Sequence, residues 1–129
     1  MGREFASAVM RWPHLEGMEV KPNIVSICGS PVTDRERAWY TAALPSITHV
    51  TDDYREVLSN PDVEAVYCAV PHFLHEQIYC DIIKAGKHLL GEKPFGIDRA
   101  ANDTIMRTIA EHPQVFVRCS SEFPFAPAM

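Results

Sequence analysis

The residues with the clearest chemical potential stand together at positions 92–94. Glu92, Lys93 and Pro94 directly follow the apolar run at 88–91. Proline has no backbone N–H and disfavours helical geometry in the residue before it, so Lys93 is held out of a helix. A lysine at the rim of a cleft can hydrogen-bond a substrate hydroxyl, and desolvation makes its amine release a proton more readily. From these three residues alone, an ordinary solvated lysine in a turn is the better interpretation, because a motif of only three residues often occurs by chance.

Two histidines, His72 and His75, form a second group, placed directly after the apolar run at 63–71. Together with Glu76, their spacing could suggest a metal site. The sequence shows no third cluster of ligands, so we expect no metal. For His72, a capping or surface role is as good an interpretation as contact with a ligand.

The elements that must position these residues alternate along the chain. The apolar periodicity predicts helices at 3–12, 34–43, 52–60, 75–87 and 98–111, and strands at 23–30, 47–50, 63–71, 87–92 and 114–119. This alternation indicates parallel strands with crossover helices, hence a doubly wound α/β sheet. Ligands of such sheets bind outside the carboxyl ends of the strands. Three of those ends carry Ser30, His72 and Lys93.

Local signals predict several helix ends and buried faces. Asp34 and Asp98 are the expected caps of two helices, and Gly86 is placed for a left-handed helix end. In the first helix, Phe5, Val9 and Trp12 share one apolar face, with Ala8 beside them. The side chains expected to face inward are Tyr54, Val57 and Leu58 in the third helix, Ile78 and Ile82 in the fourth, and Ile105, Met106 and Ile109 in the fifth.

Composition excludes several classes of protein. The chain has 129 residues, the size of one domain, and a net charge of −5, which argues against a nucleic-acid partner. No signal peptide is visible at the start, and no apolar stretch is long enough to cross a membrane. The four cysteines lack the short spacing of zinc or redox motifs, and we expect a reducing, cytoplasmic location.

The stretches "AVPHFLHEQIYCDIIKAGKHLLGEKP" and "GEKPFGID" strongly resemble the Gfo/Idh/MocA family, the glucose-fructose oxidoreductases and inositol dehydrogenases. The match runs from about Ile24 to Ser120, with His72 in place of the usual asparagine. The resemblance implies a Rossmann-like NAD(P)-binding domain that oxidises or reduces a carbon, often on a sugar or cyclitol. It implies that Lys93 is catalytic, contacting the reacting hydroxyl and assisting proton transfer. It implies a cofactor-binding set of Gly2, Ser30, Val70, Pro71, His72, His75, Glu92, Lys93 and Pro94.

The choice between NAD and NADP depends on the end of the strand that precedes Gly29. NAD-preferring Rossmann domains place an acidic residue there for the ribose hydroxyls, whereas this chain has Gly29 and Ser30. Ser30 can donate to a 2′-phosphate, and Arg35 lies a short turn away. We therefore favour NADP, although Gly29–Pro31 can also be read as a plain turn.

The resemblance also implies segments that this chain does not contain. The family begins with a strand and Gly-x-Gly-x-x-Gly, of which Gly2 matches only the third glycine. We expect a sheet that lacks its first, central strand. Either the two flanking strands then pair directly, or another segment fills the empty position, or the chain is poorly stable. We expect a partial dinucleotide-binding domain at 1–120 and, at 121–129, the start of a linker to an absent C-terminal α/β substrate domain. Glu122 stands close to where the family often has arginine.

Two functions remain open from the sequence. The first is an NAD(P)-dependent oxidoreductase for a sugar, cyclitol or related hydroxyl compound, incomplete and inactive alone. Its partners would be a small-molecule substrate and further copies joined through the absent domain. The alternative is a non-catalytic Rossmann-like module that binds a nucleotide or a protein. A receiver-type fold ranks lower, because Asp52 and Asp53 have no matching acid after an earlier strand.

Overall fold

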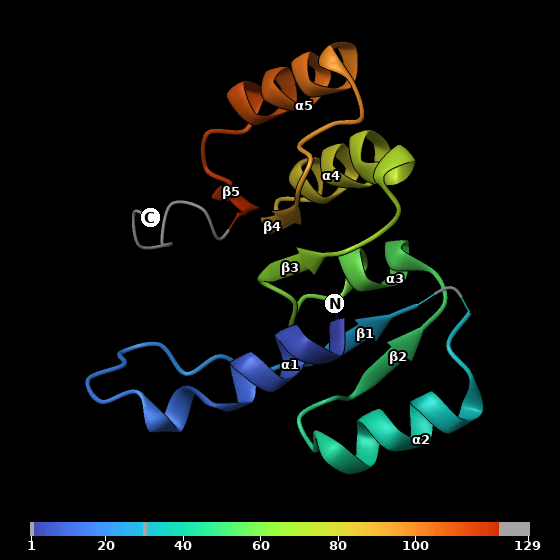
Figure 1. The fold of residues 1–129 in the computed structure, drawn as a ribbon, viewed down its shortest axis with the longest axis vertical. Helices are drawn as coiled ribbons and strands as arrows, with labels where there is room; N and C mark the ends of the chain where they lie inside the picture. The colour runs from blue at the N-terminus through green and yellow to red at the C-terminus, as the bar shows by residue number, and fades with distance from the viewer. Residues whose placement is uncertain (1, 30, 122–129) are drawn as a thin grey trace, which may run out of the picture. The chain divides into compact units, whose positions relative to one another are not determined.

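The computed structural model describes residues 2–29 and 31–121, and it divides into two compact units, Met1–Val63 and Glu64–Met129 (Figure 1). We call them the N-terminal and C-terminal units. The elements are α1 (Gly2–Met10), η1 (Trp12–His14), β1 (Ser26–Cys28), α2 (Asp34–Ala43), β2 (His49–Thr51), α3 (Tyr54–Ser59), β3 (Ala65–Cys68), η2 (His72–Leu74), α4 (His75–Lys84), β4 (His88–Glu92), α5 (Arg99–Glu111) and β5 (Val117–Ser120).

The N-terminal unit is built around a parallel pair of strands. β1 and β2 lie with Ser26 opposite His49 and Cys28 opposite Thr51. Apolar side chains from the first helix, the strands and the end of α2 form its core. The core consists of Ala6, Leu44 and Ile47, with Ile24, Ile27, Tyr40 and Val50 packed against it.

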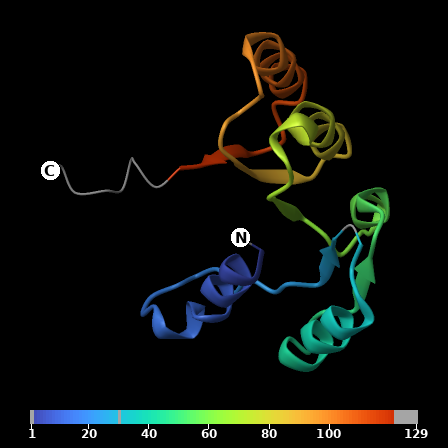
Figure 2. The same ribbon diagram turned by 45° about the vertical axis from the view of Figure 1, so that its right-hand side comes forward.

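The C-terminal unit is a three-stranded parallel sheet in the order β3-β4-β5. Figures 1 and 2 both show α4 and α5 side by side on one side of these strands. α4 packs against α5 and against β4. The side chains with 2% exposure or less come from both helices and the central strand, and they include Tyr79, Ile82, Ile83, Leu89 and Ile105. The core of this unit therefore lies beneath α4.

The expected alternation of helices with parallel strands is confirmed, but the strands form two sheets instead of one. Among the described residues, β1 pairs only with β2, and β3 pairs only with β4. Each strand is also shorter than the run predicted for it; β3, for example, ends at Cys68, whereas the apolar run extends to residue 71.

Capping residues begin two helices, one as expected and one not. Asp98 caps α5 by accepting a 2.9 Å hydrogen bond from the Ala101 amide. Asp34, however, is the first residue of α2 and not its cap. Thr33 caps α2 instead, because its hydroxyl accepts from the Glu36 amide while the Glu36 carboxylate accepts from the Thr33 amide. This reciprocal pair is a capping box.

Two expectations about buried helix faces are wrong. Met106 is 52% exposed, and the side chain of α5 that turns inward beside Ile105 is Thr108 instead. In α1 the buried residue is Ala6, whereas Ala8 is exposed. The apolar pattern predicted the helices correctly, but which side chains are buried depends on how each helix is rotated against its neighbours. The left-handed conformation at Gly86 is confirmed, with φ +74°.

In the described part of the chain, no helix is both long and apolar enough to cross a bilayer.

Candidate functional site

The candidate site lies at the carboxyl end of β4, where Gly91 has neighbours on both sides. Cys68 of β3 and Cys119 of β5 pair with it in register. A Cβ placed on Gly91 would lie 2.8 Å from the ring of Tyr79. Only glycine therefore lets Tyr79 of α4 cover the end of the central strand.

Tyr79 also supports the backbone that follows the strand. Its hydroxyl donates a 2.8 Å hydrogen bond to the carbonyl of Glu92. Its ring stacks on His75 at 4.7 Å and 20°, and it contacts Phe95 with centroids 5.2 Å apart. Burial, reinforced by nearby Cys68, Cys119 and Glu92, raises the pKa of Tyr79 above its ordinary range. The phenol therefore stays protonated and remains a hydrogen-bond donor.

His75 joins two segments at the ends of neighbouring strands. Its side chain is fully buried. The ring Nδ1 lies 2.8 Å from the carbonyl oxygen of Pro94, and Nε2 lies 3.0 Å from the carbonyl oxygen of Val70. The ring therefore lies between the segment after β3 and the segment after β4. A neutral imidazole carries one N–H and donates to one of these carbonyls at a time, whereas a doubly protonated ring donates to both.

A third side chain supports the same loop from α5. The Asn102 side-chain nitrogen donates a 2.6 Å hydrogen bond to the carbonyl of Phe95. Gly96 has φ +97°, and a Cβ there would lie 2.6 Å from the Asn102 backbone nitrogen. The loop can pass this close to α5 only because residue 96 is glycine.

Glu92 is held through its carboxylate as well as its carbonyl. The hydroxyl of Tyr67, in β3, donates a 2.6 Å hydrogen bond to Glu92 Oε1. Because successive side chains of a strand point to opposite faces, Glu92 and Tyr67 project from the face opposite Gly91 and Cys68. The acid is therefore fixed on the sheet face that the crossover helices of this unit leave open.

Lys93 stands between these supported residues, and its side chain is exposed. The bond from Lys93 to Pro94 is a cis peptide. Pro71 and His72, which follow β3, are exposed, and the ring of His72 meets the ring of His75 edge-on at 5.3 Å. The exposed amine thus stands beside a loop whose backbone is fixed from several sides.

The structure brings together most of the residues expected to form a site, but not all. The C-terminal unit holds Val70, Pro71, His72, His75, Glu92, Lys93 and Pro94. Gly2 is the first residue of α1 in the N-terminal unit. Ser30 and Glu122 lie outside the described residues. Within residues 2–29 and 31–121, no group of three or more His, Cys, Asp or Glu side chains could hold a metal ion.

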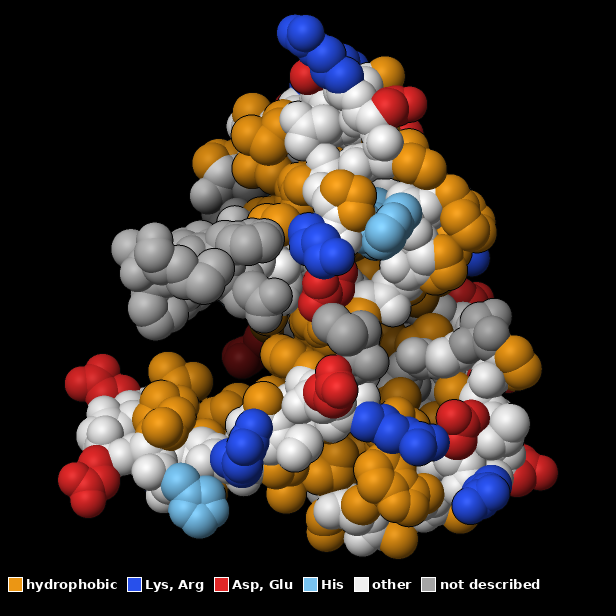
Figure 3. Space-filling view, in the orientation of Figure 1, with side chains coloured by type: hydrophobic (Ala, Val, Ile, Leu, Met, Phe, Trp, Pro, Cys, Tyr) orange, Lys and Arg blue, Asp and Glu red, His pale blue; other side chains and the backbone are white. Residues whose placement is uncertain are grey.

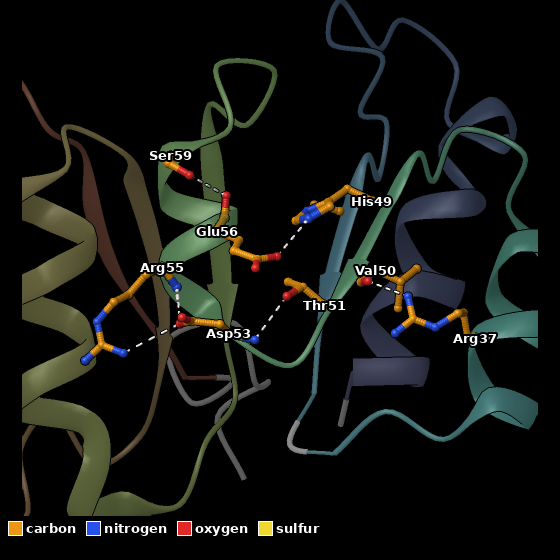
Figure 4. Close-up of polar contacts among 9 residues, drawn as sticks. Arg37, His49, Val50, Thr51, Asp53, Arg55, Glu56 and Ser59 are labelled. Carbon is orange, nitrogen blue, oxygen red and sulfur yellow. Dashed lines mark hydrogen bonds and ion pairs between the residues drawn. The ribbon is translucent and has the colours of Figure 1, made fainter.

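The N-terminal unit contains a row of three polar side chains, Ser26, His49 and Glu56, that sequence analysis did not predict. Ser26 Oγ lies 3.0 Å from His49 Nδ1, and His49 Nε2 lies 3.3 Å from Glu56 Oε2. Figure 4 shows His49 and Glu56 directed toward one another. Serine catalysis also needs donors prepared for an oxyanion, and the Gly29 amide after β1 already donates to the Thr51 carbonyl. We interpret these three side chains as a structural connection between β1, β2 and α3.

Surface charge is mixed. In the view of Figure 3, Lys and Arg side chains are interspersed with Asp and Glu and do not gather into one basic patch.

Comparison with known protein families identifies the fold. Residues 1–119 match the model of the oxidoreductase family with an NAD-binding Rossmann fold, Gfo/Idh/MocA. The chain belongs to this family. The fold class expected from the alternating elements is thereby confirmed as Rossmann-type.

Relatives of this oxidoreductase family match over part of their length. An uncharacterized oxidoreductase of Synechocystis, sll0816, is 35% identical over 95 residues, which are 74% of this chain and 25% of that protein. The scyllo-inositol 2-dehydrogenase (NADP(+)) IolU of Bacillus subtilis is 38% identical over 60 residues, 46% of this chain and 18% of that protein. The chain therefore spans about a quarter or less of these relatives.

A solved structure shows the same fold. The scyllo-inositol dehydrogenase of Lactobacillus casei, crystallised with NAD(H) and scyllo-inositol, superposes with a TM-score of 0.79 at 22% identity. The superposition covers 98% of this chain and 35% of that one.

Proposed function

We propose that this chain supplies the nicotinamide-side part of an NAD(P)-dependent oxidoreductase that acts on a sugar, a cyclitol or a related hydroxyl compound. The observation that carries the proposal is the His75 ring, which joins the segment after β3 to the Lys93 loop after β4. Ligands of parallel α/β sheets bind at such strand ends. The family and the inositol dehydrogenases among the similar proteins support the substrate class.

The residues present fit this chemistry. The nicotinamide, when bound, supplies the site that accepts or donates a hydride. Lys93 is exposed on a supported loop, where its amine can hydrogen-bond a reacting hydroxyl and take or return its proton. Glu92, held by Tyr67, is placed to accept from a ribose hydroxyl. Val70, Pro71, His72 and Pro94 would line the nicotinamide side.

Within the same proposal we favour NADP over NAD. The similar proteins include one whose name specifies NADP(+) and one crystallised with NAD(H), so the family uses both. Ser30 and exposed Arg35 follow the first strand, and a cation there suits a 2′-phosphate.

We further propose that the chain does not turn over substrate by itself, because it spans only about a quarter to a third of proteins such as sll0816 and the L. casei dehydrogenase. The remainder of such proteins would supply substrate contacts and a surface for homo-oligomers. The four cysteines are free thiols in the structure, which supports the proposed reducing, cytoplasmic location.

The test is a titration of this chain with NADPH, NADH and ATP, followed by calorimetry and nicotinamide fluorescence. We expect weak binding of both nicotinamide dinucleotides, because only Gly2 of the glycine-rich phosphate motif is present, with NADPH bound more tightly than NADH and no binding of ATP. Lys93→Ala should leave the NADPH affinity close to that of the matched variant Lys84→Ala, an exposed lysine of α4.

Three outcomes would count against parts of this account. Equal binding of ATP would favour the non-catalytic nucleotide module, and no binding of any dinucleotide would overturn the cofactor role. Reduction of NADP by this chain alone, with a panel of polyols, would contradict the proposed dependence on further segments.

A further inference from the structure

Three backbone carbonyls around Lys93 are each engaged by a side-chain group from the helices. The Glu92 carbonyl accepts from Tyr79 and the Phe95 carbonyl accepts from Asn102. The Pro94 carbonyl lies within hydrogen-bond distance of His75 Nδ1. Backbone carbonyls can be satisfied by backbone, side chains or water. In this loop the carbonyls of Glu92, Pro94 and Phe95 all have side-chain partners from α4 and α5.

His75 differs from the other two because it has two targets. The Val70 carbonyl belongs to the turn expected to line the nicotinamide, and the Pro94 carbonyl belongs to the loop of the proposed catalytic lysine. Complete burial leaves the His75 ring no exposed surface with which to contact a ligand. Stacking on Tyr79 fixes the plane of the ring, so both nitrogens are aimed by packing.

We propose that His75 is a positioning residue, whose ring sets Lys93 relative to the Val70–His72 turn by bridging the Pro94 and Val70 carbonyls. This rests on the proposed function, which assigns the two segments to one site. It replaces the direct cofactor contact expected for His75 from the family resemblance. A histidine that merely filled the core would contribute stability without setting the lysine loop.

The two ring nitrogens can be separated by substitution. An asparagine amide nitrogen reaches about the place of Nδ1, and a glutamine amide nitrogen reaches about that of Nε2. His75→Asn should therefore place a donor beside the Pro94 carbonyl, whereas His75→Gln should place a donor beside the Val70 carbonyl only. Thr108→Val is the matched control, because Thr108 is a buried hydroxyl of α5 that bonds Thr104 and Cys80 and not the lysine loop.

Two readouts need no cofactor. The first is amide hydrogen exchange of Lys93, Phe95, Gly96 and Ile97, since Pro94 has no amide hydrogen. The second is the side-chain NMR signal of Lys93, assigned by its loss in Lys93→Arg. We expect His75→Gln to raise exchange in the loop about tenfold and to shift the Lys93 signal. His75→Asn should raise amide exchange in the loop less than about threefold, and Thr108→Val should leave the Lys93 signal unchanged. Equal effects of the Asn and Gln variants, or no effect beyond that of Thr108→Val, would overturn the proposal.

The wild-type chain provides a second test should both variants fail to fold. Nitrogen-15 NMR of the histidine side chains should show a slowly exchanging ring N–H for His75 and none for exposed His14. Fast exchange of both His75 ring nitrogens would overturn the proposal. Because these measurements omit nucleotide, their failure is distinguishable from a failure to bind NADPH.

Discussion

Gly91→Ala tests the packing that supports the candidate site. The added methyl would lie 2.8 Å from two carbon atoms of the Tyr79 ring, well inside ordinary van der Waals contact. Tyr79 is fully buried and stacked on His75, so its ring cannot move aside without disturbing its neighbours. Overpacking of this kind costs about 1–3 kcal/mol. We expect the free energy of unfolding of the C-terminal unit to fall by that amount.

Two other glycines provide controls. Gly86 has φ +74° and open space around it, so Gly86→Ala should cost about 1 kcal/mol through backbone conformation alone. A Cβ placed on Gly2 would meet no other atom within 4 Å, so Gly2→Ala should change stability by less than about 0.5 kcal/mol.

Amide exchange in α4 and β4, together with urea unfolding, is the appropriate assay because two compact units can unfold separately. The decisive comparison adds Tyr79→Leu, which removes the ring that the new methyl meets. Gly91→Ala should cost less in that background, with a coupling of about 0.5–3 kcal/mol. Strictly additive effects would refute the steric reasoning.

Three further predictions concern charge. Hydrogen bonds from the Thr33 amide and hydroxyl lower the pKa of Glu36. The contribution of Glu36 to stability should therefore be present above the ordinary glutamate pKa and be lost as the pH falls through that range toward the lowered pKa. Glu36→Gln should make the urea midpoint of unfolding less dependent on pH in this acidic range. Arg35→Ala should weaken NADPH binding about tenfold and leave NADH binding unchanged, if its cation contacts the 2′-phosphate. Burial and the charge of Asp52 raise the pKa of Cys28, so iodoacetamide should alkylate it slowly at mildly alkaline pH, and Asp52→Asn should speed the reaction.

Each of these predictions has a control and a contradicting result. Glu111→Gln, at the other end of a helix, should not flatten the acid profile, and an unchanged profile in Glu36→Gln would contradict the capping argument. Arg107→Ala on α5 should spare NADPH binding, and equal losses for both cofactors in Arg35→Ala would refute the phosphate contact. The alkylation rate of Cys119 should be unaffected by Asp52→Asn. Alkylation of Cys28 as fast as that of a cysteine in a short unstructured peptide would contradict the electrostatic cause.

The sequence predicted the helices well because their end signals are local. Gly86 and Asp98 act through their own backbone or a neighbouring amide. The capping box at Thr33 and Glu36 was equally local and could have been recognised from its spacing. The division into two sheets was harder, because pairing depends on strands far apart in sequence.

The candidate site followed from strand order, whereas its supports did not. Knowing that β3 and β4 are parallel was enough to place His72 and Lys93 at one edge. That Tyr79 covers Gly91, or that Asn102 reaches the Phe95 carbonyl, depends on how α4 and α5 pack on the sheet. A tyrosine or asparagine at those positions has no spacing signature of its own. Likewise, the pairing of Ser26 with His49 requires the register of β1 and β2.

The central claim is that Lys93 and the turn at 70–72 face one nicotinamide. Chemical-shift mapping of this chain with reduced nicotinamide mononucleotide tests it directly, since that probe lacks the adenosine half of the dinucleotide. The account predicts shifts at 70–72 and at 92–95, and none at either segment with adenosine 2′,5′-bisphosphate, which lacks both the nicotinamide and its ribose. Shifts confined to the N-terminal unit, or to only one of the two segments, would contradict it.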